Sequence, residues 1–407
     1  MRLERLISLR SPQAEVCLRA RHSLYIYEAG PPSPVLAVET TDGVGDEKLA
    51  EWARRVEALS FERVGERLSM DVVAVRHVAR RAERLAEAVE VLSSTTKKPM
   101  ILCSFDTQAL KLALTSLDGY RPLLYTATGE NWRKMANLAT RYDVPLAVSE
   151  PDHERMRALI RGLGRLGVRE FMLDFGLGSG SEDWLAAVLR SLMEARKASL
   201  NGVEEFRYPF MAVVEETPEK QTVSHMTNAL AASALMLRYA DLIILRETQN
   251  WALLPLLVLK QELRSDPHKP PKVRPGLRRI GSPGVDSPVL ITSNYRQTYY
   301  IVKSDLEDLR LDCYLLVVDT GGLSVRSAVA GGQLNPDVIA EALRGSGVEG
   351  LVKRRLLILP GYASHLKDAV ERLTGWRVLV GPKDSMKIGE FLAKNLPEPR
   401  QTPEGGA

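Results

Sequence analysis

Eight short and almost wholly apolar runs, each followed by a segment able to form a helix, limit most strongly how this chain can fold. The runs lie between residues 35 and 246. A strand is apolar along its whole length when both of its faces are buried, as in a parallel sheet. The runs are VLAVE (35–39), VVAVR (72–76), MILCS (100–104), PLLYT (122–126), PLAVS (145–149), EFMLD (170–174), PFMAV (209–213) and LIILR (242–246).

The segments between the runs complete the pattern. Apolar residues recur every three or four positions in 79–93 and 152–166, which predicts helices that pack one stripe against a sheet. Eight strand–helix units predict an α/β protein with a TIM, or (β/α)8, barrel over residues 35–265. An open doubly wound sheet is the alternative, and the count of eight disfavours it. Residues 1–34 are predicted as an N-terminal hairpin segment, since 15–29 alternate, and this hairpin would plug one barrel end.

A second region of strand and helix signals follows a stretch rich in proline and glycine. Residues 266–287 are predicted as a linker, because no helix or central strand accommodates so many prolines. Residues 288–396 predict a small Rossmann-like α/β domain, and 397–407 a disordered tail. The strands expected in that domain are Val289–Thr292, Tyr314–Asp319, Leu323–Ala330, Leu356–Leu359 and Arg377–Val380.

Composition excludes several classes of protein. The net charge is only +4, so a nucleic-acid partner is not indicated, and the basic residues of the linker are interpreted as solvated or as a subunit contact. No apolar run is long enough to span a membrane, and the start MRLERLISLR lacks the features of a signal peptide, so a cytoplasmic protein is expected. The three cysteines are far apart and the six histidines form no HxH or HxxxH pair, so no metal site is expected.

Candidate chemistry gathers in the second domain. Glycine loops follow several of its strands, and ligands of open α/β sheets bind beyond the carboxyl ends of strands. Spacing alone leaves two interpretations open, a large hydrogen-bonding cofactor or turn chemistry only. Neither GxGxxG nor GxxxxGK[ST] occurs. In the barrel no catalytic residue is singled out from the polar residues expected on its rim, which are Glu39, Asp42, Arg76, Ser104, Asp106, Thr126, Glu150, Asp174, Glu215 and Glu247.

Several motifs, in order along residues 15–395, resemble a known family. In the barrel they are FERVGERLSMDVVAVR, RPLLYTATGENW, VPLAVSEPD, RYADLIIL and WALLPLL. In the second domain they are SPVLITSNYRQTYYIV, DCYLLVVDTGGLSV, AVAGGQL, LILPGYA and GWRVLVGPKDS. The chain is similar to the large (gamma) subunit of the corrinoid iron–sulfur protein of the acetyl-CoA decarbonylase/synthase, or CO dehydrogenase/acetyl-CoA synthase, complex.

The resemblance implies a barrel followed by a corrinoid-binding domain, and a methyl carrier within a methyltransferase system. A cobamide in its Co(I) state would take a methyl group from a methyl-tetrahydropterin and pass it to acetyl-CoA synthase. Implied partners are the small (delta) subunit as a heterodimer, acetyl-CoA synthase/CO dehydrogenase, and the methyl-tetrahydropterin donor or its methyltransferase. The DxHxxG motif, which supplies a lower histidine ligand elsewhere, is absent. Base-off binding is therefore expected.

Motif matching and the loop chemistry together give the expected cofactor-binding residues. Thr292 and Thr298 would hold corrinoid side-chain groups, Gly322–Val325 would lie against the ring, and Pro360–Ala363 would border it. A side chain at Gly322 would fill the space of the ring edge. The full set is Thr292, Asn294, Thr298, Thr320, Gly321, Gly322, Leu323, Ser324, Val325, Ser327, Gly331, Gly332, Pro360, Gly361, Tyr362, Ala363 and Gly381.

Two departures from the family pattern leave alternatives open. The family's four-cysteine motif is absent, so a [4Fe–4S] cluster is not expected in this chain. Many members have TEG where this chain has Thr320-Gly321-Gly322, and LT where it has Arg326-Ser327. The Arg326 side chain could contact a corrinoid amide or a carboxylate of a partner, or it could disrupt the site. The alternative functions are a corrinoid-binding or assembly protein outside acetyl-CoA metabolism, and a barrel methyltransferase.

Overall fold

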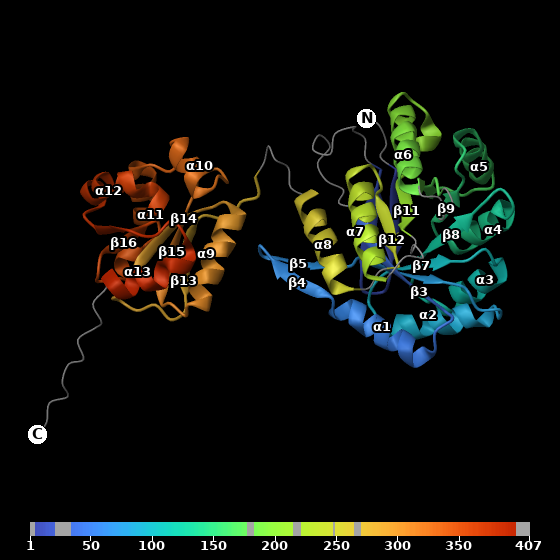
Figure 1. The fold of residues 1–407 in the computed structure, drawn as a ribbon, viewed down its shortest axis with the longest axis horizontal. Helices are drawn as coiled ribbons and strands as arrows, with labels where there is room; N and C mark the ends of the chain where they lie inside the picture. Colours follow the sequence, from blue (N-terminus) through green and yellow to red (C-terminus); the bar gives the residue numbers. More distant parts are fainter. Residues whose placement is uncertain are drawn as a thin grey trace, which may run out of the picture. The chain divides into compact units, whose positions relative to one another are not determined.

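The chain forms two compact units, one of residues 1–62 and 67–264 and the other of residues 63–66 and 265–407 (Figure 1). The structure is a computed structural model that describes residues 5–20, 34–176, 183–214, 221–246, 249–263 and 270–395. The predictions for residues 21–29, for Glu215 and Glu247, and for the tail 397–407 lie outside these ranges.

Eight parallel strands of the first unit close into a barrel, so the TIM-barrel prediction is confirmed and the open doubly wound sheet is wrong. Each strand overlaps one of the eight predicted apolar runs, because each is buried by the barrel interior on one face and by helices on the other. In order around the barrel they are β3 (Val35–Thr41), β6 (Val72–Arg76), β7 (Met100–Cys103), β8 (Leu123–Ala127), β9 (Leu146–Ser149), β10 (Phe171–Asp174), β11 (Phe210–Val214) and β12 (Leu242–Leu245).

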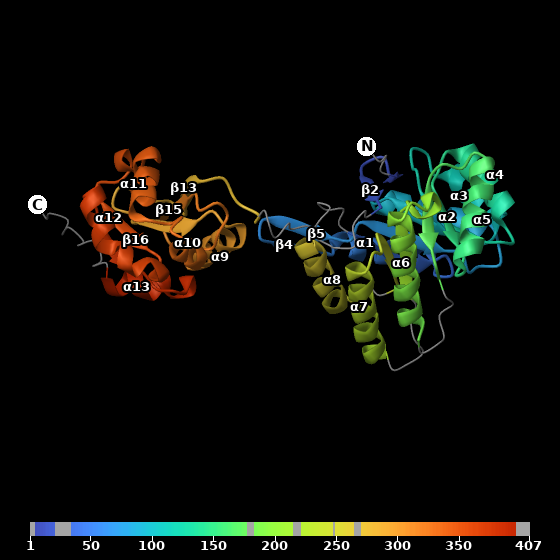
Figure 2. The same cartoon turned by 90° about the horizontal axis from the view of Figure 1, so that it is seen from above.

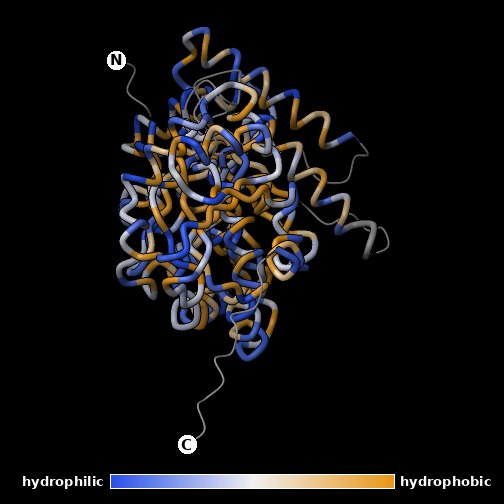
Figure 3. Tube along the Cα trace, turned by 90° about the vertical axis from the view of Figure 1, so that its left-hand side faces the viewer, coloured by the Kyte–Doolittle hydropathy of each residue, from blue (hydrophilic) through white to orange (hydrophobic). Residues whose placement is uncertain are grey.

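Helices surround the barrel and bury their apolar stripes against the strands. The predicted helices 79–93 and 152–166 correspond to α2 and α5. In Figure 3, hydrophobic stretches of the trace lie mainly toward the middle of the picture, and hydrophilic stretches are common along its edge. A short hairpin, β4 (Ser60–Arg63) and β5 (Glu66–Ser69), precedes β6. The helices are α1 (Asp46–Ala58), α2 (Glu83–Thr95), α3 (Thr107–Ser116), α4 (Trp132–Tyr142), α5 (His153–Arg165), α6 (Trp184–Leu200), α7 (Gln221–Leu237) and α8 (Asn250–Leu263).

An N-terminal hairpin closes the amino end of the barrel. It consists of the antiparallel strands β1 (Leu6–Arg10) and β2 (Glu15–Arg19), and Leu9 and Leu18 join the apolar cluster inside the barrel. The backbones of Arg10 and Arg121, just before β8, pair with each other, which places the hairpin at that end. The hairpin therefore begins earlier than the predicted 15–29, because its turn lies at residues 11–14, where the Ser11 hydroxyl accepts from the Ala14 N–H at 3.0 Å.

The second unit is a five-stranded sheet with helices on both faces. The strand order is β13-β15-β14-β16-β17, in which only β13 is antiparallel to its neighbour. Helices α9 and α13 pack on one face, and α10, α11 and α12 on the other. The strands are β13 (Gly276–Ile280), β14 (Val289–Ser293), β15 (Cys313–Val318), β16 (Leu356–Leu359) and β17 (Arg377–Val380). The helices are α9 (Arg296–Asp308), α10 (Val325–Ala330), α11 (Pro336–Gly345), α12 (Lys367–Thr374) and α13 (Ile388–Asn395).

Two predictions for this unit need correction. The segment Leu323–Ala330 was expected as a strand, yet 325–330 form helix α10, because the Ser324 side chain caps its first turn and Val325 and Ala328 share its buried face. Part of the predicted linker, 276–280, forms β13. No proline lies within these five residues, so their N–H groups are free to pair with β15 at the sheet edge.

The buried hairpin provides a test of how the barrel is closed. Leu9→Ala should lower the free energy of unfolding of the barrel by about 2–5 kcal/mol, because it leaves a cavity in the barrel interior. Leu6, in the same strand, is 45% exposed whereas Leu9 is fully buried, so Leu6→Ala should cost less than about 0.5 kcal/mol. Urea unfolding followed by tryptophan fluorescence measures both values. Equal effects of the two substitutions would show that the hairpin does not plug the barrel.

Candidate functional site

The carboxyl end of the barrel is occupied by ion pairs between its own residues. Glu39, at 5% exposure, accepts two hydrogen bonds from Arg76 at 2.9 and 2.7 Å, and a third from Arg246 at 2.9 Å. Burial lowers the pKa of Arg76, but the hydrogen bond to Glu39 and the nearby acidic groups together outweigh this effect and raise the pKa. Tyr125 donates to Asp174 at 2.7 Å, and burial, with this carboxylate, raises the tyrosine pKa. These charges neutralise one another.

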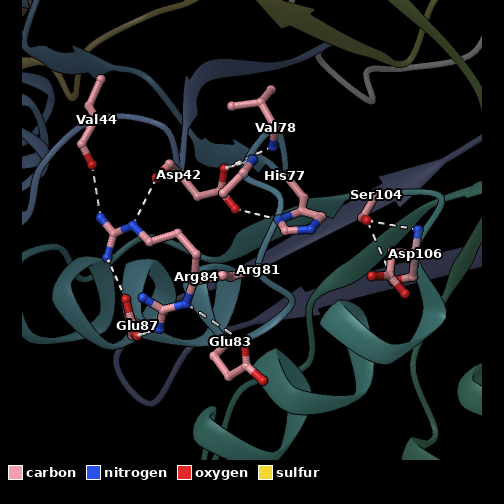
Figure 4. Close-up of polar contacts among 11 residues, drawn as sticks. Asp42, Val44, His77, Val78, Arg81, Glu83, Arg84, Glu87, Ser104 and Asp106 are labelled. Carbon is pink, nitrogen blue, oxygen red and sulfur yellow. Dashed lines mark hydrogen bonds and ion pairs between the residues drawn. The ribbon is translucent and has the colours of Figure 1, made fainter.

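Other rim residues hold the loops that follow β3, β6 and β7 (Figure 4). Asp42 is buried and contacts His77 Nδ1 at 2.5 Å, while its other oxygen accepts from the backbone N–H groups of Val78 and Ala79. Arg84 donates to the backbone oxygen of Asp42 at 2.8 Å. These polar side chains therefore act within the loops.

A cavity of about 320 Å³ opens at the carboxyl edge of the second unit's sheet. Neighbouring strands β14 and β16 lead to helices on opposite faces of the sheet, α9 and α12, so a crevice forms between their ends, where α/β sheets bind ligands. The lining residues are Leu290, Ile291, Thr292, Thr298, Ile301, Val302, Leu306, Ser324, Val325, Arg326, Ile358, Leu359, Pro360, Tyr362, Gly381, Pro382, Lys383, Ser385 and Ile388.

The cavity combines apolar walls with one buried hydroxyl. Aliphatic side chains of α9, β14, β16 and α13 form most of its surface. Thr292 is 1% exposed, and its hydroxyl has no hydrogen-bond partner within the described part of the chain. A buried hydroxyl without a partner costs about 1–3 kcal/mol. The group is therefore positioned to bond to a molecule in the cavity.

Asn294 organises the loop beside the cavity instead of facing it. Its side-chain oxygen accepts from the N–H groups of Thr320 and Gly322 and from the Thr320 hydroxyl, each at 3.0 Å. Its amide nitrogen donates to Asp319 at 2.8 Å. Asn294 is fully buried, and it fixes the chain that leads from β15 to the lining residue Ser324.

Two of the predicted glycines are required by neighbouring backbone. Gly322 has a φ of +85°, and a Cβ on it would lie 3.0 Å from the Pro270 oxygen. A Cβ on Gly361 would lie 2.8 Å from the backbone of Pro382 and Lys383. Neither glycine lines the cavity, and the contact with Pro270 is a reason within the chain for a glycine at 322. That a side chain at Gly322 would also fill ligand space stays a prediction.

The structure brings part of the predicted set together. The predicted residues that line the cavity are Thr292, Thr298, Ser324, Val325, Pro360, Tyr362 and Gly381. The others, whose contact with a cofactor stays a prediction, are Asn294, Thr320, Gly321, Gly322, Leu323, Ser327, Gly331, Gly332, Gly361 and Ala363. The sequence interpretation missed the α9 wall of Ile301, Val302 and Leu306. The spacing of these residues after Thr298 was the available signal, but on a helix it also describes ordinary core.

Comparison with known proteins identifies the family. The family described as "CO dehydrogenase/acetyl-CoA synthase delta subunit" matches residues 9–392. The chain belongs to this family. Among its relatives is the "Acetyl-CoA decarbonylase/synthase complex subunit gamma" of Methanothermobacter thermautotrophicus, 40% identical over 378 residues that cover 91% of this chain and 82% of that protein. The protein of the same name from Methanopyrus kandleri is 37% identical over 92% of this chain and 80% of its own length. The predicted family is confirmed.

Solved structures resemble the chain only in fold. A dihydropteroate synthase from Xanthomonas albilineans with 4-aminobenzoic acid matches 64% of this chain and all of its own, at 13% identity and a TM-score of 0.48. The dihydropteroate synthase of Thermus thermophilus matches 63% of this chain and 99% of its own, at 16% identity and a TM-score of 0.45. None of the helices among the described residues combines the length and apolar character that a membrane span needs.

The Asn294 contacts predict a large effect of one amide. Asn294→Ala should lower the free energy of unfolding of the second unit by about 2–4 kcal/mol, because two buried N–H groups lose their acceptor. Asn335→Ala, which removes an ordinary helix cap on α11, should cost about 1 kcal/mol. Urea unfolding followed by circular dichroism compares the two. A loss for Asn294→Ala no larger than that for the cap would contradict the organising role.

Proposed function

We propose that the chain is a corrinoid-binding, methyl-carrying gamma subunit of an acetyl-CoA decarbonylase/synthase complex. The cavity of the second unit, with the buried and unpartnered Thr292 hydroxyl, carries this proposal. Family membership and the names of the relatives support it. A bound corrinoid supplies a cobalt centre that accepts a methyl group from a methyl-tetrahydropterin and delivers it to acetyl-CoA synthase. The protein's own residues bind and orient that cofactor.

The size and chemistry of the cavity favour base-off binding of a cobamide. At about 320 Å³ the cavity is too small to enclose a corrin macrocycle, but it suits an apolar ring such as a nucleotide base. In the base-off form this base has left the cobalt and needs its own binding place. Thr292 is the residue that would hydrogen-bond the bound group.

The ion pairs at the barrel mouth argue against a barrel methyltransferase. A pterin needs free donors and acceptors at this rim. Glu39 already accepts from Arg76 and Arg246, and Tyr125 already donates to Asp174. Breaking such a buried pair to bind a ligand leaves an uncompensated charge, which is strongly destabilising. The described part of the rim therefore fits a scaffold better than a pterin site.

Exposed apolar side chains on the barrel support an association with a delta subunit. Helices α7 and α8 lie side by side (Figures 1 and 2), and the rings of His225 and Trp251 contact edge to face across them. Met226, Leu230 and Trp251 are 50–66% exposed. Apolar side chains gathered on adjacent helices are typical of a protein interface. Ile301 and Tyr362 beside the cavity are also exposed, so a partner would have apolar surface to cover there.

Replacing the unpartnered hydroxyl tests the cavity assignment. Thr292→Val keeps the shape of the side chain and removes the polar group. The affinity for a base-off cobamide should fall about 2- to 12-fold, the value of one hydrogen bond. The stability of the cofactor-free protein should stay equal or rise, because no buried donor is left unsatisfied. Titration followed by cobalt absorbance and thermal unfolding measure the two effects.

The matched control for this test is Thr374→Val. The Thr374 hydroxyl bonds to the Val370 oxygen and lies outside the cavity lining. This substitution should leave the cobamide affinity unchanged. A Thr292→Val protein that binds cobamide like the wild type would contradict the assignment of the hydroxyl. Absence of any corrinoid binding by the wild type would contradict the proposed function itself.

Co-expression tests the partner. The chain and a delta-type subunit should purify as a 1:1 heterodimer, and Leu230→Asp should weaken that complex at least tenfold by placing a charge in its apolar interface. Leu166→Asp is the control, since Leu166 is 45% exposed but follows α5 on another part of the barrel. Size-exclusion chromatography with light scattering measures the mass of the complex and the fraction of the chain that is bound. A chain that remains monomeric with the partner present would contradict the heterodimer.

A further inference from the structure

Two basic side chains from different loops lie at the mouth of the cavity. Arg326 stands in α10, after β15, and Lys383 follows β17. Both residues are exposed, and the Lys383 ammonium lies 5.6 Å from the centre of the Tyr362 ring. The walls behind them are mostly apolar. The mouth therefore differs from the interior in both polarity and charge.

No carboxylate balances these two charges at the cavity. None of the lining residues is Asp or Glu, and neither Arg326 nor Lys383 forms an ion pair within the described part of the chain. Asp384, next to Lys383 in the sequence, accepts from the Met386 N–H, and Asp305 accepts from the hydroxyl of the lining residue Ser385. The cavity therefore has two positively charged side chains at its mouth, without an ion-pair partner among the described residues, and an apolar interior behind them.

This arrangement suits a ligand with an apolar end and an anion next to it. A complete cobamide has this form, because its ring side chains are neutral amides and its nucleotide loop carries one phosphodiester, joined through the ribose to the base. With the base in the chamber, the phosphodiester reaches the mouth. Arg offers a planar fork of donors to a phosphate, and Lys a compact charge.

We propose that Arg326 and Lys383 bind the phosphodiester of the nucleotide loop and so select complete cobamides over corrinoids that lack this loop. The inference rests on the proposed function. It differs from a contact with a corrinoid amide, because it requires a negative charge on the ligand. It also differs from a contact with a partner carboxylate, because it acts on the cofactor in the absence of any partner.

The test compares three corrinoids in titrations of the full chain, followed by absorbance. Base-off cobamide and cobinamide phosphate carry the phosphate, and cobinamide does not. Arg326→Gln and Lys383→Gln should each weaken binding of the two phosphate-bearing ligands about 3- to 10-fold, and together about 10- to 50-fold, at low salt. Binding of cobinamide should stay within twofold of wild type. Added salt should reduce the wild-type preference for the phosphate-bearing ligands.

The matched control is Lys387→Gln, which removes an exposed positive charge close in sequence but outside the lining. It should leave all three affinities unchanged. Equal losses for cobinamide and cobamide in the Arg326 and Lys383 variants would overturn the inference while the proposed function stands. Unchanged corrinoid binding with a weakened delta complex would also overturn it, in favour of a partner carboxylate. A wild type that binds none of the three ligands would overturn both.

Discussion

Burial of the parallel strands on both faces is the constraint on which the rest of this structure depends. Strands such as β7 and β15 are buried at every residue, so they consist almost wholly of apolar side chains. Polar side chains therefore gather toward the carboxyl ends of the strands, as Glu39 and Thr292 do, and in the loops that follow. The two units meet this constraint differently, because one sheet closes on itself and the other stays open.

The closed sheet brings its strand ends into one ring, and the charged groups of that ring must pair with one another. Glu39 is almost fully buried, and burying a carboxylate is costly unless cations neutralise it. Arg76 and Arg246 supply that neutralisation. In the open sheet, the chain leaves β14 and β16 toward opposite faces, and the gap between these strand ends is lined mainly by apolar groups and the Thr292 hydroxyl. Within the described part of the chain, the second arrangement places the unpartnered Thr292 hydroxyl beside a cavity, where a ligand can reach it.

The same constraint explains which features could be predicted from the sequence. A strand that is buried on both faces appears in the sequence as a short apolar run. The eight strands, and from their number the closed barrel, could therefore be predicted. The N-terminal hairpin was misplaced because its turn depends on one serine contact, Ser11 with Ala14. Helix α10 was read as a strand because six residues are too few to separate the two periods. The sequence could not show why glycine is needed at positions 322 and 361. The need arises from close contacts with the backbone of Pro270 and Pro382, which are distant in sequence.

The position of Arg326 argues against one of the interpretations that its sequence left open, namely that it disrupts the site. A guanidinium inside the apolar chamber would disrupt the site, because an unpaired buried cation is too costly to retain. Arg326 is instead exposed at the mouth, where water solvates its charge and the chamber behind it stays apolar. The residue can therefore be accommodated without disturbing the binding of an apolar group, and charge recognition is the role that we propose for it. Since Lys383 reaches the same mouth from a separate loop, the positive charge belongs to the cavity as a whole, and an anionic ligand group is its natural complement.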